Sequence, residues 1–128
     1  MHINTQTNTT VLVVEDYDDT RFLLRAMLEM RGYKVVEAAD GRQAVEVAAK
    51  ELPGLILMDL NLPVLDGFEA TRQIHAQAPT RDVPVVAVPA QCGGEYRRLA
   101  LEAGCLEYVS KPINFHAMND IVTRYLAH

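Results

Sequence analysis

Short apolar runs without polar alternation recur along the chain and predict β-strands that are buried on both faces. The clearest runs are rich in Val, Ile and Leu and cover residues 11–15, 55–58 and 83–88. Two weaker runs, at residues 33–37 and 105–109, are expected at the edges of the sheet. The pattern of apolar positions therefore predicts a sheet built from these runs.

Amphipathic segments alternate with the apolar runs, and their ends carry residues that are typical of helix boundaries. Asp18, Asp40 and Asp66 can cap helix N-termini, and Glu69 stands at capping-box spacing from Asp66. The expected helices run from Asp18 to about residue 31, from Asp40 onward, from Asp66 to about residue 77, through the stripe of Tyr96, Leu99, Ala100 and Ala103 to Gly104, and after Asn114.

Strict alternation of strands and helices is typical of a parallel sheet with helices on both faces. We therefore predict an α/β protein, a three-layer sandwich with a five-stranded parallel sheet and five helices. The 128 residues are enough for one domain with a substantial core. Residues 1–10 are polar and are expected to form an N-terminal tail, and residues 11–128 are expected to form the domain.

Composition argues against several classes of function. The formal net charge is −5 and no block of Lys or Arg occurs, so direct nucleic-acid binding is not expected. No apolar stretch approaches the roughly 18 residues of a membrane span, and the N-terminus lacks the basic region of a secretory signal. Cys92 and Cys105 do not suggest a disulfide framework or a zinc site, and we interpret them as buried thiols in a cytoplasmic protein.

Charged residues follow three of the apolar runs, where each strand is expected to end. Glu15 and Asp16 stand at the end of the first run, Asp59 follows the leucine-rich run, and Lys111 follows the last run. Ligand sites in open parallel sheets form outside the carboxyl ends of the strands, so these side chains are expected to share one crevice. Three carboxylates and one ammonium group suit a divalent cation together with a phosphoryl group.

Each of these side chains also has an ordinary interpretation when it is taken alone. A partly desolvated Asp59 suits a nucleophile that forms an acyl phosphate, but it could be a helix or turn cap. Glu15 and Asp16 repel each other, which Mg²⁺ would relieve, but they could be a solvated or capping pair. Lys111 could contact a phosphoryl oxygen, helped by a cis bond to Pro112, or it could be a surface lysine.

Four motifs together point to a known family. The motifs are Glu15-Asp16, residues 55–63 (LILMDLNLP), Asp66-Gly67-Phe68 and Lys111-Pro112. In their order and placement they resemble the receiver domain of two-component response regulators, including chemotaxis regulators. The resemblance extends over residues 11–126. It implies a flavodoxin-like fold with strand order 2-1-3-4-5.

The resemblance also implies a role for each site residue. Asp59 would accept a phosphoryl group from a phosphohistidine on a sensor histidine kinase or a phosphotransfer protein, with Mg²⁺ or Mn²⁺ as the cofactor. Asp16 and Asp59 would bind the cation directly, Glu15 through water, and Asn61 through its backbone carbonyl. Lys111 would pair with the phosphoryl group or, before transfer, with Asp59.

One position departs from the family pattern. The family has Thr or Ser at the end of the fourth strand, where this chain has Pro89, and proline offers neither a hydroxyl nor a backbone N–H. The backbone N–H of Ala90 and the ammonium of Lys111 remain to bind the phosphoryl group, so phosphorylation is expected to survive. Tyr108 matches the family's aromatic switch residue, and its usual coupling to the phosphoryl group is expected to be altered.

Several consequences of Pro89 stay open. The domain could signal weakly, or through a loop instead of Tyr108. Alternatively, the helix that starts near Gly93 and Gly94 could already be mobile. Pro89 could also be tolerated at the strand end without any effect on function.

The leading hypothesis is a phosphoacceptor signalling module rather than an enzyme, with its downstream partner on the face of the last two helices and last strand. It could be a stand-alone regulator, a phosphorelay intermediate or the receiver of a larger kinase. The alternative is a degenerate receiver that binds partners independently of phosphorylation. An aspartyl phosphatase is disfavoured because Asn61 stands where a second acid would be needed.

Overall fold

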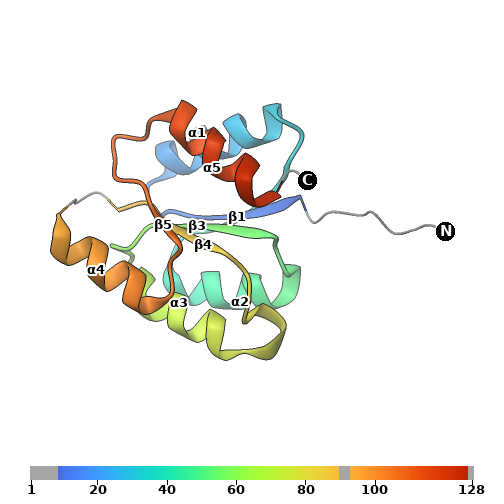
Figure 1. The fold of residues 1–128 in the computed structure, drawn as a ribbon. Helices are drawn as coiled ribbons and strands as arrows, with labels where there is room; N and C mark the ends of the chain where they lie inside the picture. The colour runs from blue at the N-terminus through green and yellow to red at the C-terminus, as the bar shows by residue number, and fades with distance from the viewer. Residues whose placement is uncertain (1–8, 90–92, 127–128) are drawn as a thin grey trace.

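The computed structural model describes residues 9–89 and 93–126. Within them, five parallel strands form one sheet in the order β2-β1-β3-β4-β5, which confirms the predicted strand order (Figure 1). The strands are β1 (Thr10–Val14), β2 (Lys34–Ala38), β3 (Leu55–Met58), β4 (Val85–Ala87) and β5 (Glu107–Tyr108). The two weakest apolar runs indeed form the edge strands β2 and β5.

Helices cover both faces of the sheet and complete the three layers. Helices α1 and α5 lie on one face, and α2, α3 and α4 lie on the other (Figure 1). Their bounds are α1 (Asp18–Met30), α2 (Gly41–Glu51), α3 (Gly67–Ala76), α4 (Gly94–Ala103) and α5 (Phe115–Leu126), with a short 3-10 helix at Ala78–Thr80. Among these described helices, none has both the length and the apolar character needed to cross a membrane.

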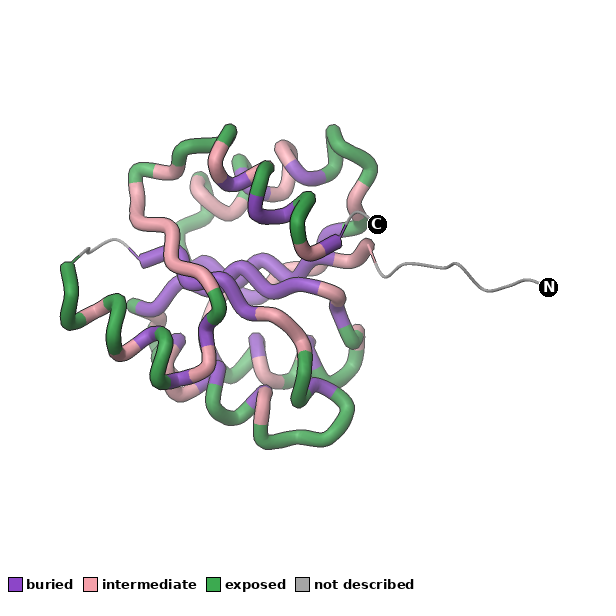
Figure 2. Tube along the Cα trace, in the orientation of Figure 1, coloured by how far each residue is buried: buried purple, intermediate pink, exposed green. Residues whose placement is uncertain are grey.

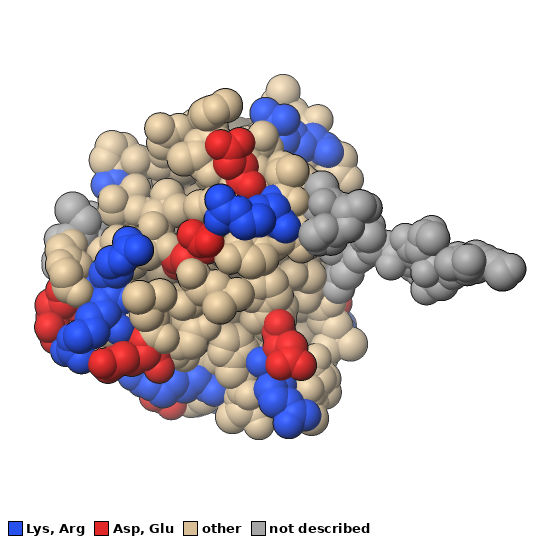
Figure 3. Space-filling model, viewed as in Figure 1, with Lys and Arg blue, Asp and Glu red and all other residues tan. Residues whose placement is uncertain are grey.

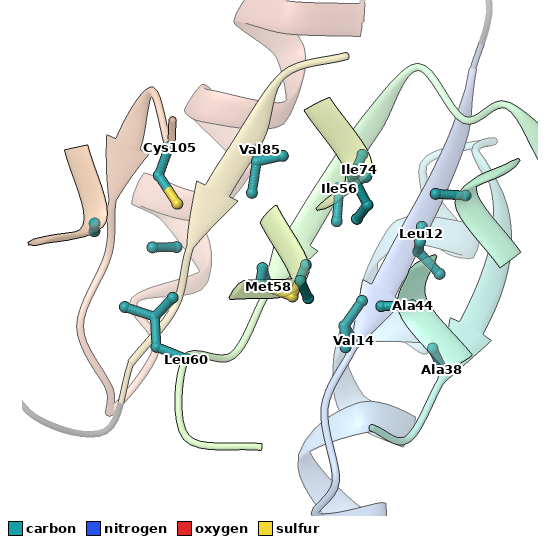
Figure 4. Close-up of a cluster of buried hydrophobic side chains, with 14 residues drawn as sticks. Leu12, Val14, Ala38, Ala44, Ile56, Met58, Leu60, Ile74, Val85 and Cys105 are labelled. Atoms are coloured by element: carbon teal, nitrogen blue, oxygen red, sulfur yellow. The ribbon is translucent and has the colours of Figure 1, made fainter. Parts of the chain in front are cut away.

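The central strands are buried on both faces, which explains why their sequences lack polar alternation (Figure 2). Leu12, Val14, Ile56 and Met58 point toward α2, α3 and α4, where they join one apolar cluster (Figure 4). The residues between them along β1 and β3 point to the other face. There they pack with α1 and α5 in a second cluster that includes Val11, Val13, Leu55, Leu57, Leu24, Leu28, Met118 and Val122.

Two of the three predicted aspartate caps are confirmed. The side chain of Asp40 accepts a hydrogen bond from the Gln43 backbone N–H at 2.8 Å, and that of Asp66 accepts one from Glu69 at 2.9 Å. The prediction for Asp18 is wrong, because Tyr17 occupies the N-cap position and offers no side-chain cap. The Asp18 carboxylate instead pairs with the Arg21 guanidinium at 2.6 Å, one helical turn further on.

His75 of α3 is partly buried. Its Nε2 lies 2.8 Å from the Val83 carbonyl oxygen, so the ring connects α3 to the segment that leads into β4. Gly104, which ends α4 with a φ of +113°, leaves room for this ring, since a Cβ there would lie 2.7 Å from His75 Nδ1. His116, in contrast, is exposed.

Candidate metal centre at the carboxyl edge of the sheet

The register of the two central strands places the acidic residues side by side. Val14 of β1 pairs with Met58 of β3, so the residues that follow them, Glu15 and Asp59, leave the sheet at the same edge. The Asp59 backbone N–H donates to the Val14 carbonyl at 3.0 Å, which holds this exit point. The backbone pairing at the strand ends thus places both carboxylates at this edge.

Glu15, Asp16 and Asp59 form an acidic cluster in which each offers one carboxylate oxygen, all within 4.8 Å of one another. Glu15 is only 2% exposed and Asp59 only 4%, whereas Asp16 is open to solvent. Clustered carboxylate oxygens are the donors that a hard cation such as Mg²⁺ prefers. The donor set therefore fits Mg²⁺, with the exposed Asp16 on the side from which a hydrated ion can enter.

Lys111 contacts two members of this cluster. Its Nζ lies 2.7 Å from Glu15 Oε1 and 3.6 Å from Asp59 Oδ2. The Lys111 backbone N–H donates to the Pro89 carbonyl at 2.9 Å, so the end of β4 positions the lysine. The Lys111–Pro112 peptide bond is cis.

Burial and charge shift the acid–base properties of the site. Desolvation is the main cause that raises the pKa of Asp59 from 3.8 to about 6, and the negative charges of Glu15 and Asp16 add to it. The hydrogen bond from the Asn61 N–H and the charge of the Lys111 ammonium act in the opposite direction. Burial alone would lower the pKa of Lys111, but its hydrogen bond to Glu15 and the charge of Asp59 raise it overall. The site thus holds a charged lysine beside an Asp59 carboxylate whose ionised form is disfavoured.

The loop between β3 and α3 is held by close packing that the sequence analysis did not foresee. The Gly67 backbone N–H donates to the Leu60 carbonyl at 3.0 Å, and a Cβ on Gly67 would lie 2.3 Å from the Asp59 carbonyl oxygen. A Cβ on Gly41 would lie 1.8 Å from the Leu65 carbonyl oxygen. Only glycine therefore allows the first residues of α2 and α3 to approach this loop so closely.

Arg21 of α1, which no sequence pattern singled out, supports the acidic strand end. The Arg21 guanidinium donates to the Glu15 carbonyl at 2.8 Å and also pairs with Glu37 of β2 at 3.2 Å. Arg25 binds the other Glu37 oxygen at 2.5 Å. Arg21 thereby ties the start of α1 to the residue that carries a cluster carboxylate.

The remaining residues singled out from the sequence lie around this cluster or outside the described residues. Pro89 is buried at the end of β4, and Ala90 lies outside the described residues, as does Cys92. Tyr108 on β5 is half-buried, and the Arg97 guanidinium lies 5.9 Å from the centre of its ring. The Asn61 backbone N–H donates to Asp59 Oδ1 at 3.1 Å.

Replacing Lys111 with methionine is expected to lower the free energy of unfolding by about 2 kcal/mol at pH 8, because two buried carboxylates lose their cation. The loss should shrink at pH 4.5, because the pKa of Asp59 is raised to about 6 and its carboxyl group is then protonated. Urea unfolding at both pH values measures the effect. Lys34→Met, at an exposed position on β2, is the matched control and should change stability by less than about 0.5 kcal/mol. Equal losses in both variants would contradict the assigned role of the ammonium.

Together the fold and this edge define a class: a flavodoxin-like α/β protein with an acidic cation pocket and a lysine at the carboxyl ends of its strands. The family model described as the response regulator receiver domain matches residues 11–123. The chain therefore belongs to the receiver domain family of response regulators.

Relatives in this family include proteins of very different length. The chain is 34% identical over 117 residues to the polar-differentiation response regulator DivK of Brucella anthropi, covering 91% of this chain and 94% of DivK. It is 38% identical over 104 residues to the response regulator PleD of Caulobacter vibrioides, covering 81% of this chain but only 23% of PleD.

Solved structures show the same fold. The receiver domain of the sensor histidine kinase PA1611 from Pseudomonas aeruginosa, with a magnesium ion in its active site cleft, is 40% identical with a TM-score of 0.86, covering 92% of this chain and 97% of that one. This chain is also similar to a chain in the co-crystal structure of the Saccharomyces cerevisiae phosphotransfer protein Ypd1 with the receiver domain of the response regulator Ssk1. The identity is 32% and the TM-score 0.84, covering 95% of this chain and 91% of that one.

Proposed function

We propose that Asp59 accepts a phosphoryl group from a phosphohistidine on a sensor histidine kinase or a histidine phosphotransfer protein. A carboxylate oxygen of Asp59 forms the new P–O bond, the P–N bond to the imidazole breaks, and the donor nitrogen keeps the electron pair. The observation that carries this proposal is the Lys111 ammonium 3.6 Å from Asp59 Oδ2, beside the acidic cluster. Phosphoryl transfer needs such positioned positive charge more than it needs acid–base groups.

Asp16, Asp59 and the Asn61 backbone carbonyl would hold Mg²⁺ or Mn²⁺, with Glu15 acting through water. The ion, when bound, supplies positive charge that offsets the negative charge of the carboxylates and the phosphoryl oxygens. Lys111 neutralises charge on the opposite side, and the Asn61 N–H fixes the orientation of the Asp59 carboxylate. The backbone N–H of Ala90 is proposed as a further phosphoryl ligand.

The domain is then a regulatory phosphoacceptor that supports only its own phosphorylation and autodephosphorylation. Turnover of external phosphate esters would require a general acid two residues after the nucleophile, where Asn61 stands. The free, buried thiol of Cys105 is compatible with work in the cytoplasm, where thiols stay reduced. The alternative of a phosphorylation-independent binding module leaves the pairing of Asp59, the acidic cluster and Lys111 without a purpose.

Intact mass measurement after incubation with Mg²⁺ and acetyl phosphate tests the proposal. The wild-type chain should gain the mass of one phosphoryl group, and the gain should disappear with Asp59→Asn or with EDTA. No gain in the wild-type chain would instead favour the phosphorylation-independent module. Continuous release of phosphate from unrelated monoesters would support an aspartyl phosphatase.

A groove beside the site is proposed to receive a helix of the phosphohistidine donor. Leu23 and Met30 of α1 and Phe115 of α5 are exposed and line a groove of about 490 Å³. A neighbouring hollow shares Leu23 and Phe115 and continues to Lys111. Continuity with the lysine allows a donor seated in the groove to bring its histidine to Asp59.

Leu23→Asp is expected to slow transfer from a phosphohistidine donor protein about tenfold or more, because it places a charge in the centre of the apolar contact. Labelling by acetyl phosphate should be unchanged. Leu101→Asp is the matched control, since Leu23 is 52% exposed and Leu101, on α4, is 46% exposed. Equal slowing in both variants, or none in Leu23→Asp, would rule out the groove as the docking site.

The output is proposed to pass through α4, β5 and α5, with a switch that differs from the family pattern at Pro89. Replacing Pro89 with Thr should enlarge the change at the Tyr108 ring on phosphorylation, because it supplies the missing hydroxyl. Aromatic NMR shifts of Tyr108, recorded with and without acetyl phosphate, measure the change. Equal responses in the two proteins would show that Pro89 is silent.

A further inference from the structure

Two hydrogen bonds in series connect Asp59 to helix α4. The Asn61 backbone N–H donates to Asp59 Oδ1 at 3.1 Å, and the Tyr96 hydroxyl donates to the Asn61 side-chain oxygen at 3.0 Å. Asn61 and Tyr96 lie 35 residues apart in the sequence. The side chain of Asn61 thus contacts a helix that the Asp59 carboxylate does not itself reach.

Packing fixes the Tyr96 ring and therefore its hydroxyl. The ring lies 5.8 Å from that of Phe68 on α3, with the two planes tilted by 41°, and it packs against the apolar cluster below the sheet. Because the contacts with α3 and the core restrain the Tyr96 ring, its hydroxyl has a defined position. The hydrogen bond to Asn61 is consequently sensitive to movement of the β3–α3 loop relative to α4.

The rest of α4 buries only small side chains. Its buried residues are Ala100 and Ala103, and Gly93 at its N-cap provides no side-chain cap. The charged groups on its outer surface pair with one another, Arg98 with Glu95 and Glu102, and Figure 3 shows basic and acidic atoms interspersed there. Apart from the Arg97 guanidinium, which lies 5.9 Å from the centre of the Tyr108 ring, these contacts leave Tyr96 as a strong determinant of where the start of α4 lies.

Pro89 increases the importance of this contact. It is buried at the end of β4, directly before the segment that leads to α4, and it has no hydroxyl or N–H to donate toward Asp59. A signal from Asp59 to α4 cannot pass through a donor at that position. The Asn61 side chain offers a route from the other side of the site.

We propose that Tyr96 is a positioning residue whose hydrogen bond to Asn61 transmits occupancy of the Asp59 site to α4, and this inference rests on the proposed function. A cation or a phosphoryl group on Asp59 changes how strongly its oxygen accepts from the Asn61 N–H, and the Asn61 main chain adjusts. Tyr96 then holds or loses the Asn61 side chain. A hydrogen bond of this kind changes an equilibrium by about three- to tenfold, and an exposed partner such as Asn61 places it at the lower end.

Backbone amide NMR during a Mg²⁺ titration tests the link in the intact chain. In the wild-type chain, amides of residues 59–61 and of α4 should shift together. In Tyr96→Phe, which removes only the hydroxyl, the α4 shifts should fall by about half or more while those of residues 59–61 persist. Asn61→Ala should have the same effect on α4, and the double variant should add nothing.

Tyr125→Phe is the matched control, because the Tyr125 hydroxyl donates to Glu107 Oε2 at the same distance of 3.0 Å but on α5. Its α4 shifts should equal those of the wild-type chain. Equal α4 shifts in Tyr96→Phe and the wild-type chain would overturn the inference. Because Mg²⁺ requires no phosphoryl group, this result stands apart from the acetyl phosphate experiment, whose failure would overturn the proposed function instead.

Discussion

Replacing Gly67 with alanine is expected to lower the free energy of unfolding by about 3 kcal/mol and to abolish phosphorylation of Asp59. The added Cβ would lie 2.3 Å from the Asp59 carbonyl oxygen and 2.7 Å from the Leu60 Cα. Both are backbone atoms, which cannot rotate away as the end of a side chain can. Either α3 or the β3–α3 loop must therefore move.

Gly94→Ala provides the matched control. Gly67 and Gly94 are each the first residue of a helix, but a Cβ on Gly94 would meet no atom of the described residues within 4 Å. Alanine there should leave stability unchanged or raise it by about 0.5 kcal/mol, because alanine favours helix more than glycine does. Urea unfolding and acetyl phosphate labelling of both variants measure the difference. Similar effects at the two positions would contradict the importance of the close approach at Gly67.

Asp59→Asn is expected to raise the free energy of unfolding of the metal-free protein by about 2 kcal/mol at pH 7.5. Burial and the charges of Glu15 and Asp16 raise the pKa of Asp59 from 3.8 to about 6, so ionising it opposes folding. The native state binds more protons than the unfolded state between these values. The stability of the wild-type chain should thus fall as the pH rises from about 4 to about 6, and the neutral amide of the Asp59→Asn variant removes this particular loss.

Magnesium should reverse the order of the two proteins. Binding to the native wild-type chain stabilises it in proportion to the logarithm of ion concentration, whereas Asp59→Asn lacks one of the proposed ligands. Thermal unfolding of both proteins in EDTA and in excess Mg²⁺, at pH 4 and at pH 7.5, measures the effect. An equal Mg²⁺ effect on both proteins, or a wild-type chain that is the more stable one in EDTA at pH 7.5, would contradict this description of the site.

Features of the fold that depend on local sequence were predictable. The strands β1 and β3 are buried on both faces, so their apolar runs stood out, and the charged residues after them marked the strand ends. Asp40 and Asp66 cap helices through bonds to residues three positions away, which spacing alone can indicate. Parallel strand order then brought the acidic residues to one edge.

Features that depend on tertiary contacts were not predictable in this way. Asp18 fits the pattern of a cap, but its carboxylate pairs with the Arg21 guanidinium, which the Glu15 carbonyl and Glu37 of β2 hold in place. The close approach at Gly67 exists only once α3 packs on the β3–α3 loop, and the motif around Gly67 gave no reason for the glycine. The contact between Tyr96 and Asn61 joins distant segments, and no periodicity in the sequence reports such a pair.

The central claim is that Asp59, the acidic cluster and Lys111 act as one site for a cation and a phosphoryl group. A crystal structure of the protein with Mg²⁺ and beryllofluoride, which mimics a phosphoryl group on aspartate, tests it most directly. We expect the beryllium on Asp59, the ion in contact with Asp16 and Asp59, and the Lys111 ammonium on a fluorine atom. An ion bound elsewhere, or an unmodified Asp59 with Lys111 still on Glu15, would contradict the account.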